Sequence, residues 1–114
     1  MITIVAKSII KPGRKEDFKI LTEKLIKESR KEIGCISYNL YEDINHPNIL
    51  TFIEEWKNEE AIKLHNVSKH YTGIVPKLSE LREGKTEINL YKLIEDKFNI
   101  KQGTVLCLTI PYYR

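Results

Sequence analysis

The stretch that decides the fold is "CISYNLYEDINHPNILTFIEEW", residues 35–56. Its first part, residues 35–43, alternates in polarity, with Ile36, Tyr38 and Leu40 on one side of a predicted strand. The run Ile49–Trp56 is rich in β-branched and aromatic residues, which favour a second strand. Between them, residues 45–48 read Asn-His-Pro-Asn and are dense in turn formers. The two strands are therefore expected to form a hairpin.

The sequence before the hairpin predicts a strand and then an amphipathic helix. Ile2–Ile10 is rich in β-branched residues and ends at the turn sequence Lys-Pro-Gly, residues 11–13. From Arg14 onward, apolar residues recur at helical spacing through a highly charged segment that stops at Gly34. The residues expected on the buried face are Phe18, Leu21, Leu25 and Ile33, with Ile20 and Ile26 on the flank.

The sequence after the hairpin predicts a second helix and a fourth strand. Asn58 can cap this helix, Pro76 is expected to kink or restart it, and Gly84 is expected to end it. Residues 87–95 then form the last strand. The resulting order, β-α-β-β-α-β, is that of a ferredoxin-like α+β fold, a four-stranded antiparallel sheet with both helices on one face.

Both faces of the predicted sheet are apolar. Ile4 and Ala6 alternate with Val5 and Ile9 in the first strand, and the third strand shows the same pattern. Two helices can bury only one face, so another surface must cover the second. A second copy of the chain is the simplest cover, and a homodimer with sheets packed face to face is expected.

The 114 residues are enough for one domain, expected over residues 1–96. Residues 97–114 form an extension that is either an extra strand or a loosely packed tail.

The 19 basic and 16 acidic residues are intermixed, which argues against a nucleic-acid partner. No run approaches the roughly 20 apolar residues of a membrane helix, and no basic leader stands at the start, so a cytoplasmic protein is expected. Cys35 and Cys107 are expected to be reduced thiols.

The segment "EEWKNEEAIKLHNVSKHY", residues 54–71, holds the only Trp and two of the three His. His65 and His70 are five positions apart, or about 140° around an ideal helix, so that no shared metal site is expected. Glu54 and Trp56 share a strand face with Leu50 and Phe52. His65 is expected on the same helix side as the apolar Ala61, Ile62 and Leu64. An acid and an imidazole beside a core are either structural partners or working groups.

Residues 11–71 resemble the antibiotic biosynthesis monooxygenase family, which includes quinol monooxygenases. The matching elements are Pro12-Gly13, Glu32-x-Gly34-Cys35-x-x-Tyr38, Pro47, Glu54-x-Trp56, and Ala61-x-x-x-His65 followed by His70-Tyr71. The resemblance implies a dimeric α+β barrel of ferredoxin-like subunits with a pocket between sheet and helices. It also implies the oxidation of a quinol- or anthrone-like aromatic by O2, with no flavin, haem or metal cofactor.

On this resemblance His65 is the candidate base or proton relay, because the unperturbed pKa of histidine, about 6.5, suits neutral pH. Glu54 would orient His65 or hold a substrate hydroxyl. Trp56 and Tyr38 would supply ring surface, and Asn39 or His70 would make further polar contacts with the substrate. His70 is expected to take no part in proton transfer, because it follows the point where the helix can be interrupted.

The chain departs from the haem-degrading branch of that family, because residues 1–10 contain no Asn and Val75 stands where that branch has a His. Two other functions remain open at this point. One is a proton-shuttling isomerase of a small phosphorylated hydroxyketone, whose pocket should hold convergent Lys or Arg side chains. The other is a non-catalytic dimer that binds a small molecule. An oxygenase should instead have an apolar cavity lined by aromatic rings.

Overall fold

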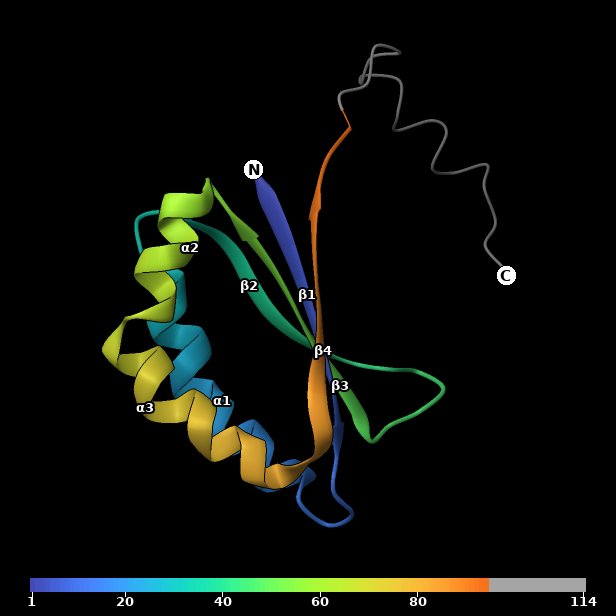
Figure 1. Cartoon of the computed structure of the whole chain (residues 1–114). Coiled ribbons are helices and arrows are strands. Elements are labelled where there is room, and N and C mark those ends of the chain that lie inside the picture. Colours follow the sequence, from blue (N-terminus) through green and yellow to red (C-terminus); the bar gives the residue numbers. More distant parts are fainter. Residues whose placement is uncertain (95–114) are drawn as a thin grey trace.

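The computed structural model describes residues 1–94 and has a sheet covered on one face by helices (Figure 1). The elements in order are β1 (Ile2–Ile10), α1 (Lys15–Arg30), β2 (Cys35–Glu42), β3 (Ile49–Trp56), α2 (Glu59–Asn66), α3 (Lys69–Leu78), the 3₁₀ turn η1 (Ser79–Leu81) and β4 (Arg82–Lys92). The strand order is β2-β3-β1-β4, and all three pairings are antiparallel. The predicted ferredoxin-like α+β fold is confirmed.

The register of the strands sets up a row of side chains on the helix-covered face. Ile4 of β1 pairs with Glu54 of β3 on one side and with Leu90 of β4 on the other. Glu54 in turn pairs with Tyr38 of β2. Since side chains alternate along a strand, these four residues point to the same face. A buried carboxyl is thus placed between a phenol and two aliphatic side chains.

Helix α1 buries small hydroxyl side chains as well as large apolar ones. Its buried residues are Phe18, Thr22, Leu25 and Ser29. The expectation that Ile33 lies on this face is wrong, because α1 ends at Arg30 and Ile33 is 99% exposed in the turn that follows. Ile20, expected on the flank, is also exposed. Thr22 can be buried because its hydroxyl donates a hydrogen bond to the Lys19 carbonyl, 3.0 Å away.

The second helical segment is broken earlier than the sequence suggested. Helix α2 ends at Asn66, and α3 begins at Lys69 with Ser68 as its N-cap, whose hydroxyl accepts from the Tyr71 amide at 3.2 Å. The restart expected at Pro76 is therefore found at Ser68, and Pro76 lies within α3. A serine cap satisfies an amide that would otherwise lack a partner, which makes the restart at Ser68 favourable.

The expectation that Gly84 ends the helix is also wrong. The helical turns finish at Leu81, and Gly84 lies inside β4 with a φ of 71°. The pairing of β1 with β4 shifts register between Lys7 and Ile9, next to this glycine. Glycine adopts positive φ without a steric penalty, so β4 can bulge here and begin five residues before the expected start at residue 87.

The predicted extension, residues 97–114, and Cys107 lie outside the described residues, so the domain boundary at residue 96 stays a prediction. Cys35 is half-buried, and burial raises the pKa of its thiol to about 11. Among residues 1–94, no helix has the length and apolar character needed to cross a bilayer.

The face of the sheet opposite the helices carries no covering element among residues 1–94 (Figure 1). Val5 pairs with Ile53 on this face, and Ile9, Tyr41 and Tyr91 of the same face are exposed. We expect this apolar face to pack against a second copy, because such a surface is rarely left in water. Sedimentation at micromolar concentration should then give about twice the chain mass of 13.4 kDa. A monomer under these conditions would contradict the expectation.

Candidate functional site

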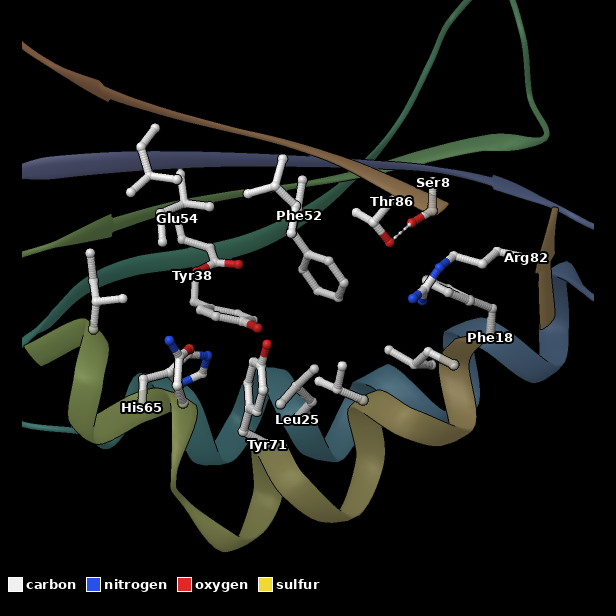
Figure 2. A pocket seen from close by; sticks show the side chains of 18 residues that line it. Ser8, Phe18, Leu25, Tyr38, Phe52, Glu54, His65, Tyr71, Arg82 and Thr86 are labelled. Carbon is white, nitrogen blue, oxygen red and sulfur yellow. Dashed lines mark hydrogen bonds between the residues drawn. The ribbon is translucent and has the colours of Figure 1, made fainter. Parts of the chain in front are cut away.

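A cavity of about 450 Å³ lies between the sheet and the helices. This volume is in the range of small-molecule sites. Its walls carry four aromatic rings, from Phe18, Tyr38, Phe52 and Tyr71. Figure 2 shows polar groups at both ends: His65 and Glu54 at one, and Ser8, Thr86 and Arg82 at the other. The cavity therefore suits a flat apolar molecule with polar groups at its ends.

His65 enters the cavity from α2. The helix begins at Asn58, whose side chain accepts a hydrogen bond from the Ala61 amide at 2.9 Å, as the sequence predicted. One turn later His65 is only 2% exposed, whereas Leu64, expected on the same side, is exposed. The packed start of α2 thus fixes the direction in which the imidazole points.

The two ring nitrogens of His65 have different surroundings. Nδ1 lies 2.7 Å from Oε2 of Glu32, while Nε2 is buried with no hydrogen-bond partner among the described residues. Burial lowers the pKa of His65, although the hydrogen bond and charge of Glu32 act in the opposite direction. A neutral imidazole that donates from Nδ1 to an ionised carboxylate keeps a lone pair on Nε2. His65 thus offers a proton acceptor.

Aromatic rings enclose the His65 imidazole. The ring of Trp56 is 4.5 Å away between centroids, Tyr71 is 5.0 Å away, and Tyr38 is 5.4 Å away. Trp56 is fully buried, and burial also raises the pKa of the Tyr38 hydroxyl, with the nearby Glu54 charge acting in the same direction. These rings exclude water from the base, which strengthens any charge interaction formed beside it.

Glu54 is the acid at the same end of the cavity. It is 6% exposed, and its Oε1 atom accepts a hydrogen bond from Nε1 of Trp56 at 2.9 Å. Burial raises the pKa of the Glu54 carboxyl from 4.5 to about 7, although the Trp56 hydrogen bond acts against the rise. Near neutral pH, Glu54 therefore exists in both protonation states. It can either accept a proton or donate a hydrogen bond.

The other end of the cavity is formed by β4 and β1. The hydroxyls of Ser8 and Thr86 are 3.1 Å apart, and Ser8 is buried. The Nε atom of Arg82 is buried with no partner among residues 1–94, and burial lowers the pKa of this guanidinium. A guanidinium with an unused donor can hold a carbonyl or hydroxyl oxygen of a bound molecule.

Glu32 is the site residue that the periodicity of the sequence did not reveal. It lies in the turn between α1 and β2, where its amide donates to the Ser29 carbonyl and its carbonyl accepts from the Cys35 amide, both at 3.0 Å. The same side-chain atom, Oε2, lies 2.7 Å from Nδ1 of His65 and 2.7 Å from Nε2 of His70. The only signal in the sequence was its position in the motif Glu32-x-Gly34-Cys35.

The premise that His65 and His70 lie on one continuous helix, from which no shared metal site was expected, is wrong. The angle of about 140° holds for one continuous helix, but α2 and α3 are separate helices joined at Val67 and Ser68. Both imidazoles consequently reach Glu32, and the donor atoms of the three side chains lie within 4.8 Å of one another.

The spacing within this cluster indicates hydrogen bonds more than metal ligands. Two ligands of a tetrahedral zinc with bonds of about 2.0–2.2 Å lie roughly 3.3–3.6 Å apart. Glu32 Oε2 is 2.7 Å from each histidine nitrogen, which is the length of a charge-assisted hydrogen bond. A proton between each pair accounts for these distances without an ion.

The structure separates the six candidate site residues into three groups. His65, Glu54 and Tyr38 line the cavity. Trp56 lies directly behind them and holds Glu54. Asn39 and His70 are not among the residues that line the cavity. Asn39 follows Tyr38 on the strand and so faces away, where it accepts from Nη2 of Arg30 at 2.7 Å.

Glu54 was expected to orient His65 or to hold a substrate hydroxyl, but the carboxylate in contact with the His65 ring is that of Glu32. Glu32 Oε2 lies 2.7 Å from His65 Nδ1, whereas Glu54 accepts a hydrogen bond from Trp56. The difference follows from direction: Glu32 approaches from the α1–β2 turn, and Glu54 projects from the sheet.

Gly34 fixes the distance between the Glu32 turn and α2. A Cβ atom at this position would collide with Cβ of Ala61, and the Gly34 carbonyl accepts from the Lys57 amide at 2.9 Å. We expect Gly34→Ala to lower the free energy of unfolding by about 1–3 kcal/mol, as overpacking does. A urea titration measures this change.

The matched control is Gly73→Ala in α3, where a new Cβ would meet no atom within 4 Å. Alanine is the better helix former by up to about 1 kcal/mol, so this control should be neutral or stabilising. Equal destabilisation by the two variants would show that the contact with Ala61 is not what requires glycine at residue 34.

The sequence model of the antibiotic biosynthesis monooxygenase family matches residues 1–77. The chain belongs to this family. The matched residues of this antibiotic biosynthesis monooxygenase domain include Glu32, Glu54, His65 and His70, whereas Arg82 lies beyond the match.

Other members and relatives agree with this assignment. A Bacillus subtilis protein named "Putative monooxygenase YcnE" is 34% identical over 83% of the chain and 100% of its own length. A Synechocystis protein is 39% identical over 81% of this chain. The matched segment covers 63% of the length of the Synechocystis protein. The crystal structure of a conserved protein from Methanosarcina mazei is 44% identical, with a TM-score of 0.79 over 80% of this chain and 90% of that one. Family membership is thus supported by both sequence and fold, and a general monooxygenase-like function by the family description and the name of the Bacillus subtilis relative.

Proposed function

We propose that this protein is a cofactor-independent monooxygenase that oxidises a quinol- or anthrone-like aromatic with O2. The observation that carries the proposal is His65, which lines an apolar cavity with aromatic walls and whose buried Nε2 atom has no hydrogen-bond partner among the described residues. A base in such a place can remove a proton from a phenol or enol and keep the anion away from water.

The reaction then uses the electron-rich anion formed by this proton transfer. For an anthrone, the enolate carbon and O2 form a C–O bond, which gives a hydroperoxide after protonation. Loss of water from the hydroperoxide converts the CH₂ group of the anthrone into a carbonyl. One oxygen atom of O2 enters the product and the other leaves as water, so the substrate supplies all four electrons that O2 requires.

Glu54 is suited to the second half of this reaction. A carboxyl whose pKa is about 7 is partly protonated at neutral pH and can give a proton or a hydrogen bond to the peroxide oxygen. Arg82, at the far end of the cavity, would hold the substrate oxygen that lies farthest from His65. One end of the cavity would thus carry out proton transfer, and the other end would position the substrate.

The cavity favours this function over the phosphorylated hydroxyketone isomerase. Among the described residues that line the cavity, Arg82 is the only Lys or Arg side chain. A phosphate that carries two negative charges is usually held by several converging donors. A non-catalytic dimer that binds a small aromatic remains the second candidate, because the same cavity would accept such a ligand.

Oxygen uptake tests the proposal. A panel of hydroquinones and anthrones is supplied to the purified protein in air-saturated buffer with a chelator and no added cofactor. We expect consumption of one O2 per anthrone oxidised, with incorporation of one labelled atom from ¹⁸O₂ into the product. Binding of panel members without oxygen uptake would instead support the non-catalytic binding function.

A further inference from the structure

A line of polar contacts leads from the cavity to the outer surface of the helices. It runs from His65 through Glu32 to His70, and all three side chains are largely buried. His70 also lines a groove of about 530 Å³ between α1 and α3, and this groove shares no lining residue with the cavity. The cluster therefore connects an enclosed base with an open groove.

The position of Glu32 Oε2 limits which nitrogen atoms of His65 and His70 carry protons. Oε2 of an ionised Glu32 can accept one hydrogen bond from Nδ1 of His65 and another from Nε2 of His70. The remaining nitrogen of His65 is Nε2, which is buried with no partner among residues 1–94, and the remaining nitrogen of His70 is Nδ1. A single carboxylate charge offsets one imidazolium, so a second positive imidazole in the cluster is unfavourable.

Contrary to the expectation from the sequence that His70 takes no part in proton transfer, we propose that His70 is the proton outlet of the site: when His65 takes a proton from the substrate, His70 releases one into the groove. This inference rests on the proposed function. In the first event the substrate O–H bond breaks, and its proton binds to Nε2 of His65. In the second, the N–H bond at Nδ1 of His70 breaks, and that proton passes to water or buffer. The cluster therefore holds the same number of protons before and after the exchange.

The electrostatics of the cluster agree with such an exchange. Burial lowers the pKa of His65, the Glu32 hydrogen bond and charge raise it, and the charge of His70 lowers it. Loss of the His70 proton consequently makes His65 a stronger base at the moment when it holds the substrate's proton. The other ionisable groups that face the two histidines are Glu28, Lys24, Lys69 and Lys77 in the groove and Tyr38, Glu54 and Tyr71 beside the cavity.

The first test uses His70→Gln, because an amide N–H can still donate to Glu32 but cannot release a proton at neutral pH. We expect at least about a tenfold loss in kcat at low buffer concentration with the panel member that the wild type oxidises fastest. In His70→Ala the loss should be reversed by added imidazole, which can occupy the vacated volume. His46→Gln is the matched control, since His46 is 67% exposed on the β2–β3 hairpin.

Rescue of His70→Ala by imidazole, with no effect of imidazole on the His46 variant, would support the outlet. Full activity of His70→Gln at every buffer concentration would overturn it. Loss without rescue, accompanied by an equal loss of stability in both His70 variants, would assign His70 a structural role and would also overturn it.

The second test does not depend on turnover. Imidazole ¹⁵N chemical shifts report the tautomer and the titration of each histidine. We expect His65 to carry its proton on Nδ1, and its titration midpoint to move to higher pH in His70→Gln but not in His46→Gln. An unchanged midpoint would overturn the exchange. A shifted midpoint in a protein that consumes no O2 would leave the proton coupling in place and reject the oxygenase function alone.

Discussion

Replacing His65 by alanine is expected to lower kcat by at least about 10²-fold for the panel member that the wild type oxidises fastest, because general-base catalysis contributes about 10²–10⁴-fold. Within residues 1–94, His65 is the buried imidazole in the cavity whose Nε2 atom has no partner. Oxygen uptake measured from pH 5 to 9 gives the size of the loss. It also shows whether the acidic limb of the pH profile, which reflects protonation of the base, disappears with the histidine.

Two variants separate lost chemistry from lost packing. His65→Ala leaves a void beside the fully buried Trp56 ring, so His65→Gln, which keeps most of the volume, should be compared by thermal melting. His46→Ala is the control, because His46 lies on the exposed hairpin. Wild-type rates in both His65 variants would remove this residue from the mechanism.

Replacing Glu54 by glutamine is expected to raise the free energy of unfolding at pH 8 by about 3 kcal/mol. The pKa of Glu54 rises from 4.5 to about 7 on folding, and each unit corresponds to about 1.4 kcal/mol. The folded protein binds the extra proton, so the wild type loses this stability as the pH rises from about 4.5 through 7. Glutamine carries no charge and can still accept the hydrogen bond of the Trp56 indole.

The measurement is a series of urea titrations between pH 5 and 8. We expect the difference between Glu54→Gln and the wild type to be small at pH 5 and to grow toward pH 8. Glu55→Gln is the matched control, because Glu55 is the next residue on β3 and points to the opposite face. A difference that does not change with pH would show that Glu54 is not a buried carboxyl with a raised pKa.

The same Glu54→Gln protein should be a poorer catalyst. A residue that costs stability at neutral pH and is nevertheless present at a cavity wall is typical of a working group. If Glu54→Gln is both more stable at pH 8 and slower in oxygen uptake, the stability cost and the function belong to the same carboxyl.

Much of the fold could be predicted because periodicity is a local property. The bounds of β1 and β3 agree with the predicted runs, since continuous runs of β-branched and aromatic residues favour strands. The predicted cap at Asn58 is also present. The predicted end of the second helix was wrong because glycine at residue 84 has two uses, and a β-bulge competes with a helix stop.

Part of the candidate site was visible for the same reason. Tyr38, Glu54 and Trp56 lie on helix-facing positions of their strands, and His65 lies one turn after Ala61. Asn39 could not share the cavity with Tyr38, because neighbouring residues of a strand point to opposite faces. The polar members of α1, such as Thr22 and Ser29, were missed because hydrophobic periodicity does not count buried hydroxyls.

By itself, the sequence determined the order of the strands and helices, the two apolar faces of the sheet and the family to which the chain belongs. Only the tertiary structure decided which groups meet at the site. Glu32 reaches His65 and His70 across 33 and 38 residues of chain, because the α1–β2 turn packs against two separate helices. The raised pKa of Glu54 has the same origin, since a carboxyl is desolvated by the atoms that surround it in space and not by its neighbours in sequence.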